Sequence, residues 1–144
     1  MKYETMLERF LGYVNFKSRS NAASTTIPST PEQKDFLRML KGQLEELNLS
    51  DIVLNEENWF LTATLPANTD KPYDRIGFIS HVDTADFNVE GINPQVIENY
   101  DGEDIVLNKD LNIVMTKEEF PNLNNYKGLT LITTDGTTLL GADD

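Results

Sequence analysis

The spacing of apolar residues predicts two helices in the first third of the chain. Over residues 3–16 apolar side chains recur at intervals of three and four, the period of a helix that buries one face: Tyr3, Met6, Leu7, Phe10, Leu11 and Val14. A second helix begins near Pro31, which suits the first helical position, and Thr30 and Gln33 have the spacing of a capping box. Its apolar positions continue to Leu47.

Short apolar runs then predict strands at residues 52–54, 59–65, 76–80, 104–107, 129–133 and 137–140. The first two enclose a polar link and predict a hairpin. Residues 76–80 are almost continuously apolar, which predicts a central strand covered on both faces. Asp135-Gly136 is a turn signal before the last run. The polar stretch 84–126 is long for a structureless loop, so we expect it to line a functional region or to contain further short elements.

Helices followed by strands indicate an α/β fold class and not an all-β sandwich. The chain has 144 residues, enough for one core, and residues 1–144 contain no repeat or linker signal. We therefore expect them to form part of a single domain.

Composition excludes several classes of function. A net charge of −12 argues against binding to nucleic acid or to anionic membrane surfaces. The absence of cysteine excludes disulfides, thiolate metal sites and cysteine nucleophiles. No apolar run approaches the roughly 18 residues of a membrane span, and the start of the chain lacks the pattern of a signal peptide. We expect a cytoplasmic protein.

The only histidine, His81, follows the predicted central strand, and Asp83 lies two residues further on. Residues two apart on a strand point to the same side, and ligand sites in open α/β sheets gather where strands end. A carboxylate beside an imidazole can fix its tautomer and leave the other nitrogen for a metal. The same pair could also serve as an oriented base in a hydrolytic triad, or could simply be solvated at the surface.

Asp143 and Asp144 follow another apolar run at the end of the chain. Two carboxylates at a strand end can bind a cation, and one carboxylate can bridge two ions. The alternative is a helix N-terminus, where aspartate caps the helix and complements its dipole.

Longer segments carry a more specific pattern. Residues 79–84 (Ile-Ser-His-Val-Asp-Thr), the upstream Thr-Leu-Pro-Ala-Asn at 64–68 and the final residues 131–144 together resemble the peptidase T group of the M20 metallopeptidase family. Residues 7–11, 28–30, 93–95 and 98–100 fit the same pattern, so the resemblance covers nearly the whole chain.

The resemblance implies a di-zinc aminopeptidase that removes the N-terminal residue from tripeptides. It implies the N-terminal part of an αβα three-layer zinc-exopeptidase catalytic domain, with a mixed sheet and flanking helices. It also implies His81 as a ligand of one zinc, Asp83 as the carboxylate that orients it and Asp143 as the bridge between two zinc ions. Asp144 occupies a position that the family does not use as a ligand. The family's general-base glutamate, its further ligands and its lid domain are absent from these 144 residues, so we expect the chain alone to be inactive.

Two alternatives remain open. Other M20 hydrolases, such as a dipeptidase, a carboxypeptidase or an N-acyl deacylase, share the His-x-Asp pair and the bridging aspartate. A non-catalytic binding fragment is the other possibility, because few of the expected metal ligands are present.

Overall fold

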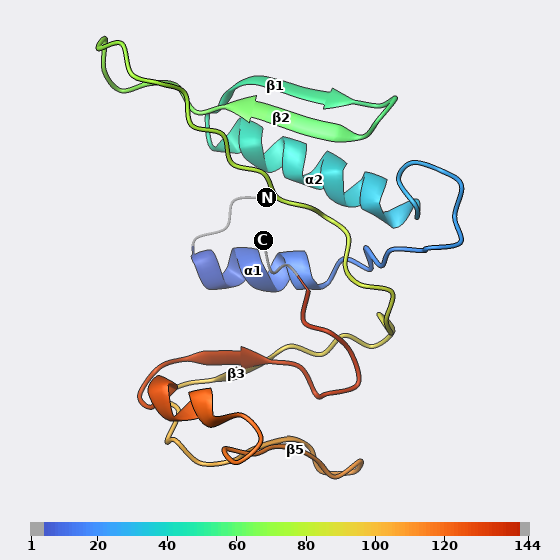
Figure 1. The fold of residues 1–144 in the computed structure, drawn as a ribbon, viewed down its shortest axis with the longest axis vertical. Coiled ribbons are helices and arrows are strands. Elements are labelled where there is room, and N and C mark those ends of the chain that lie inside the picture. The colour runs from blue at the N-terminus through green and yellow to red at the C-terminus, as the bar shows by residue number, and fades with distance from the viewer. Residues whose placement is uncertain (1–4, 142–144) are drawn as a thin grey trace. The chain divides into compact units, whose positions relative to one another are not determined.

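The computed structural model describes residues 5–141, which divide into two compact units that meet in sequence at Asp86 and Phe87. The first unit contains α1 (Met6–Val14), α2 (Glu32–Glu46), β1 (Ser50–Asn55) and β2 (Phe60–Thr64) (Figure 1). The second contains β3 (Gln95–Ile97), β4 (Ile105–Asn108), β5 (Ile113–Met115), the 3₁₀ helix η1 (Pro121–Tyr126) and β6 (Leu131–Thr133).

This combination of helices and strands confirms the α/β class. Within residues 5–141 the strands pair as three antiparallel two-stranded sheets, β1 with β2, β3 with β6 and β4 with β5. The expected mixed sheet is not seen in this part of the chain. None of its helices is long and apolar enough to cross a membrane.

The two predicted helices are confirmed, with shorter bounds for the first. At the start of α1 the Thr5 hydroxyl accepts the Glu8 N–H at 3.1 Å, and the Glu8 carboxylate accepts the Thr5 N–H at 3.0 Å. This capping box satisfies N–H groups that a helix leaves without partners. Tyr13, in the last turn of α1, and Phe16, just after the helix, pack on the buried ring of Phe36 in α2 with ring centroids 5.7 and 4.6 Å apart. An aromatic cluster therefore joins the two helices.

The capping box predicted for α2 is wrong, although the helix begins where expected. No side chain caps the helix N-terminus. Instead the buried Gln33 amide donates to the hydroxyls of Thr30 and Ser29 at 3.0 and 3.1 Å. The Thr30 hydroxyl in turn donates to the Arg19 carbonyl at 2.9 Å. These polar side chains attach the preceding loop to the first turn of α2. The loop supplies the hydrogen-bond acceptors that the Gln33 amide needs.

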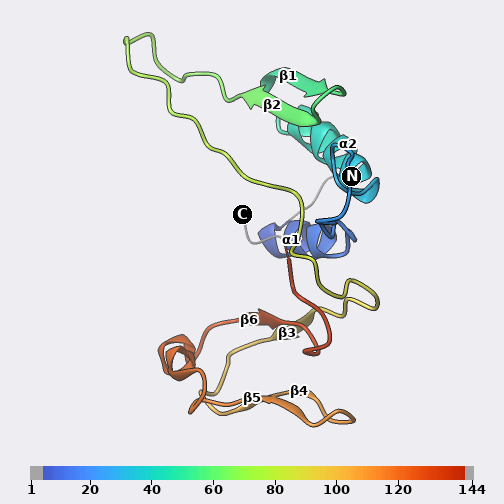
Figure 2. The ribbon, with the colours of Figure 1, turned by 45° about the vertical axis from the view of Figure 1, so that its right-hand side comes forward.

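The predicted hairpin is confirmed as β1 and β2, which lie beside α2 (Figure 2). Trp59 ends the turn between them, and its N–H donates to the Asn55 carbonyl at 2.7 Å. The Lys34 and Arg38 cations of α2 lie 4.7 and 4.9 Å from the centroid of its indole ring. These cation–π contacts fix the hairpin on the helix.

The central strand predicted at residues 76–80 is wrong for this chain. The segment is irregular, within the long open connection that follows β2 in Figure 1, and no described residue pairs with it. Phe78 and Ile79 are 95% and 99% exposed. Apolar residues favour a strand only where neighbouring strands satisfy the backbone groups and other layers cover the side chains. Residues 5–141 supply neither.

In the second unit, the weak strand predicted at residues 104–107 and the strand at 129–133 are confirmed as β4 and β6. The sequence did not predict β3, β5 or η1, which lie in or beside the stretch expected to contain short elements. The core consists of Tyr100, Ile105 and Leu123, with Ile97, Leu107, Met115 and Leu131 packed around them.

The return strand predicted at residues 137–140 is wrong, whereas the turn before it is confirmed. Gly136 has a φ of 80°, a conformation that glycine adopts without strain. The Asp135 carboxylate accepts the Thr137 N–H at 2.9 Å and its hydroxyl at 2.6 Å. The buried Thr134 hydroxyl donates to the Thr138 carbonyl at 2.9 Å. Side-chain hydrogen bonds thus close the segment locally and replace a strand ladder.

Candidate functional site

His81 and Asp83 lie in the loop that ends the first unit. The His81 Nδ1 atom is 2.7 Å from the backbone carbonyl oxygen of Asp83 and 3.3 Å from its carboxylate. A carbonyl oxygen can only accept a hydrogen bond, so Nδ1 carries the proton in this contact. In a neutral imidazole Nε2 is then the nitrogen with the lone pair that a metal needs. The side chain of His81 is 54% exposed, so the ring can be reached from solvent.

The two residues come together in an irregular segment and not on a strand. The sequence assigned the orienting role to the Asp83 carboxylate. In the structure the same residue presents two acceptors to Nδ1, and its backbone carbonyl is the nearer one. The roles of His81 as a metal ligand and of Asp83 as its orienting carboxylate stay predictions.

The loop is attached at Thr84 to the segment between α1 and α2. The Thr84 N–H donates to the Ser18 carbonyl at 3.1 Å, and the Ser20 N–H donates to the Thr84 carbonyl at 2.8 Å. Together they form an isolated parallel bridge between Arg19 and Thr84. Ser18 is buried, so the bridge is anchored in the interior of the first unit.

Sequence reasoning did not identify Arg19. Its Nε and Nη2 atoms lie 2.6 and 2.5 Å from one carboxylate oxygen of Asp86, which follows the bridge. The two residues are 67 positions apart, and neither has a local pattern that predicts the pair. Only the fold reveals it.

The predicted metal ligand Asp143 and its neighbour Asp144 lie outside the described residues. Residues 5–141 contain no group of three or more His, Asp or Glu side chains arranged to hold a metal ion. Among the predicted site residues, the structure therefore places His81 and Asp83 together and leaves Asp143 as a prediction.

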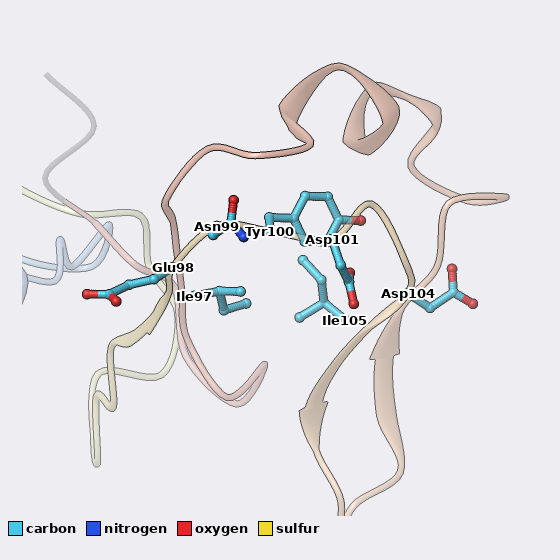
Figure 3. Close-up of a pocket in the computed structure, with 7 residues that line it drawn as sticks. All are labelled: Ile97, Glu98, Asn99, Tyr100, Asp101, Asp104 and Ile105. Atoms are coloured by element: carbon cyan, nitrogen blue, oxygen red, sulfur yellow. The ribbon is translucent and has the colours of Figure 1, made fainter.

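A separate hollow of about 280 Å³ lies in the second unit (Figure 3). Ile97, Tyr100 and Ile105 form its apolar centre, whereas the carboxylates of Glu98 and Asp104 point outward at opposite ends. Burial raises the pKa of Tyr100, and the neighbouring carboxylates raise it further while Lys117 opposes them. The Tyr100 hydroxyl donates to the Glu103 carbonyl, as expected of a core residue. This hollow is part of the core of the second unit, and we assign no chemistry to it.

Comparison with known proteins gives a consistent result. No family model matches the chain. Curated relatives named Peptidase T match it along its length: 65% identity over 99% of the chain in Fusobacterium nucleatum, 56% over 99% in Enterococcus faecalis and 57% over 100% in Streptococcus equi. The chain spans 34–35% of the length of these relatives. These matches confirm the resemblance to peptidase T.

Proposed function

We propose that this chain, which is homologous along its whole length to about a third of the Peptidase T proteins, forms part of a tripeptide aminopeptidase. The observation that carries the proposal is the 65% identity over 99% of the chain, which includes the stretches around His81 and Asp143. The substrates would be small peptides with a free N-terminus. The catalytic domain would be the αβα three-layer domain of the M20 metallopeptidases.

Zinc fits the donor that the structure describes. His81 donates from Nδ1 to the Asp83 carbonyl at 2.7 Å, which leaves Nε2 as the coordinating nitrogen, and imidazole suits zinc. His81 would hold one of two zinc ions, Asp143 would bridge both, and Asp83 would keep the imidazole oriented. When bound, zinc supplies a Lewis acid and lowers the pKa of water toward neutrality.

The residues of this chain would contribute to hydrolysis by holding the metal ligands in a fixed geometry. Hydrogen bonding to Asp83 holds the His81 ring in one tautomer, so the ring need not reorient when it coordinates a metal. The Asp83 carboxylate, 3.3 Å from Nδ1, would support the same orientation. Asp143 would set the separation of the two ions.

We propose in addition that the 144 residues alone are inactive. A catalytic zinc normally has three protein ligands, and residues 5–141 contain no group of three side chains arranged to hold one. By the peptidase T resemblance, the general base and further ligands would lie beyond the part that this chain matches. Without these ligands and the general base, the isolated chain would have a non-catalytic role.

The test is a chimaeric protein in which residues 1–144 replace the matching third of the Fusobacterium nucleatum Peptidase T. It should release the N-terminal residue from a tripeptide. Preferential cleavage of a dipeptide, release of the C-terminal residue or hydrolysis of an N-acylated amino acid would instead assign the chain to another M20 hydrolase. The isolated chain with zinc should show none of these activities.

Point variants of the chimaeric protein test the residue roles. His81→Ala and Asp143→Ala should each lower kcat/KM for the tripeptide by at least about 100-fold, the upper end of the effect of an outer-shell residue. Asn68→Ala, an exposed substitution in the loop that follows β2, is the control and should leave kcat/KM unchanged. Near-parental kcat/KM in either variant would contradict the role given to that residue.

A further inference from the structure

The peptide unit between Asp83 and Thr84 has hydrogen-bond partners at both ends. Its carbonyl accepts from His81 Nδ1 at 2.7 Å, and its N–H donates to the Ser18 carbonyl at 3.1 Å. A peptide unit is planar, so its C=O and N–H point in opposite, fixed directions. Whatever holds the Thr84 N–H therefore also directs the carbonyl that receives the His81 proton.

Arg19 lies at the centre of the contacts that hold this peptide unit. Its two neighbours, Ser18 and Ser20, make both backbone hydrogen bonds to Thr84. Its guanidinium binds the Asp86 carboxylate through Nε and Nη2 at 2.6 and 2.5 Å, on the other side of the bridge.

The Arg19 backbone is itself fixed on α2. Its carbonyl accepts from the Thr30 hydroxyl at 2.9 Å and lies 3.5 Å from the Gln33 amide nitrogen. Gln33 is buried, so this attachment belongs to the folded base of the helix and not to a mobile surface contact. Hydrogen bonds thus connect α2 to the His81 ring through Arg19, Thr84 and Asp83.

The ion pair between Arg19 and Asp86 is better suited to positioning the loop than to stabilising the whole unit. The side chains of Arg19 and Asp86 are 46% and 49% exposed, and ion pairs this exposed stabilise a fold only slightly. Such a pair adds little to the stability of the unit. It can still favour one arrangement of the loop, because it joins Arg19 to the segment that follows Asp83 and Thr84.

We infer that Arg19 is a positioning residue which, through Asp86 and the Thr84 bridge, directs the Asp83 carbonyl and so holds His81 in the Nδ1–H tautomer, the form in which Nε2 carries the lone pair. The tautomer follows from the contacts described here, and only the coordination rests on the proposed function. Unconstrained histidine prefers the Nε2–H form, so the device works against the intrinsic preference of the ring.

The chain offers a clean measurement, because His81 is its only histidine. Long-range ¹H–¹⁵N NMR of the chain at about pH 8.5, above the ordinary histidine pKa of about 6.5, reports which ring nitrogen carries the proton. The parent should show predominantly the Nδ1–H form. Arg19→Ala and Asp86→Ala should each shift the ring toward Nε2–H, and Arg19→Lys, which keeps the charge, should lie between. Arg75→Ala removes an exposed arginine six positions before His81 and should change nothing.

Exchanging the charges of residues 19 and 86 distinguishes a positioning role of Arg19 from a general disturbance of the loop. The double variant Arg19→Asp/Asp86→Arg should restore most of the parental tautomer population, which neither single variant does. The fluorescence of Trp59, in the same unit, should be unchanged in all variants, because the fold is intact. An unchanged tautomer population in Arg19→Ala, or a failure of the double variant to restore it, would overturn the inference.

Zinc affinity then separates this inference from the proposed function. In the chimaeric protein Arg19→Ala should weaken zinc binding by about 10–100-fold, as loss of an outer-shell partner does elsewhere. A tautomer shift with no change in zinc affinity would uphold the effect of Arg19 on the ring and contradict the role of His81 as a ligand.

Discussion

Phe36 joins the two helices of the first unit, and shortening its side chain should destabilise that unit strongly. Phe36 is 6% exposed, with ring centroids 5.7 Å from Tyr13 and 4.6 Å from Phe16. Replacing a buried phenylalanine by alanine costs about 3–5 kcal/mol in lost burial and cavity formation. Phe36→Leu keeps most of the apolar volume but loses both ring pairs, each worth about 0.5–1.5 kcal/mol, so it should cost about 1–3 kcal/mol.

Urea unfolding followed by tryptophan fluorescence measures this change. Trp59 is the only tryptophan and contacts Lys34 and Arg38 of α2, so its emission reports the unfolding of the first unit. Phe60→Leu, at a ring that is 68% exposed, is the control and should stay within about 0.5 kcal/mol of the parent. A loss below about 1 kcal/mol for Phe36→Ala, or equal losses for the two Phe36 variants, would refute the packing argument.

Three other predictions follow from single positions. Ile79→Lys should change the free energy of unfolding by less than about 0.5 kcal/mol, because Ile79 is 99% exposed; a larger loss in urea unfolding would show contacts that the structure lacks. Hydrogen bonds from Thr137 lower the pKa of Asp135, so its contribution to stability is present above about pH 4 and is lost as the pH falls through the folded-state pKa. Amide exchange of residues 87–141 between about pH 6 and pH 3 should show a smaller acid-side loss in Asp135→Asn than in the parent, and identical pH dependence would contradict this. Gly136→Ala should cost more than Gly91→Ala by the same exchange measurement, because both have positive φ (80° and 73°) but only at Gly136 would the new Cβ lie 2.7 Å from a β5 side chain; equal losses would contradict the clash.

Local patterns predicted the elements whose stabilising partners lie nearby in sequence. The amphipathic spacing of α1 and α2 and the hairpin of β1 and β2 were confirmed, because each is completed by residues within the same short stretch. The pairing of β3 with β6 joins residues 95–97 to residues 131–133, and no local pattern encodes such a contact. The segment 76–80 shows the opposite case, a local pattern that the structure does not follow. Its apolar residues predict a buried strand, but burial depends on partners that residues 5–141 do not supply.

The candidate site divides in the same way. The sequence identified His81 and Asp83 because their spacing is local, and the structure places them in contact. It could not show that the Asp83 backbone carbonyl is the nearer acceptor, because that depends on how the loop turns. The sequence did not reveal the contacts of Arg19, because its partners Thr84 and Asp86 are distant in sequence. Asp143 lies outside the described residues, so the bridging role stays a prediction.

We propose that His81 binds zinc in a peptidase T-type aminopeptidase. The measurement that tests this role is the zinc content of the chimaeric protein and of its His81→Ala variant, dialysed side by side against the same buffered free zinc concentration. The parental chain should hold two zinc ions and the His81→Ala variant clearly fewer, while Asn68→Ala retains both. Equal zinc content and equal zinc affinity in the parent and His81→Ala would contradict it.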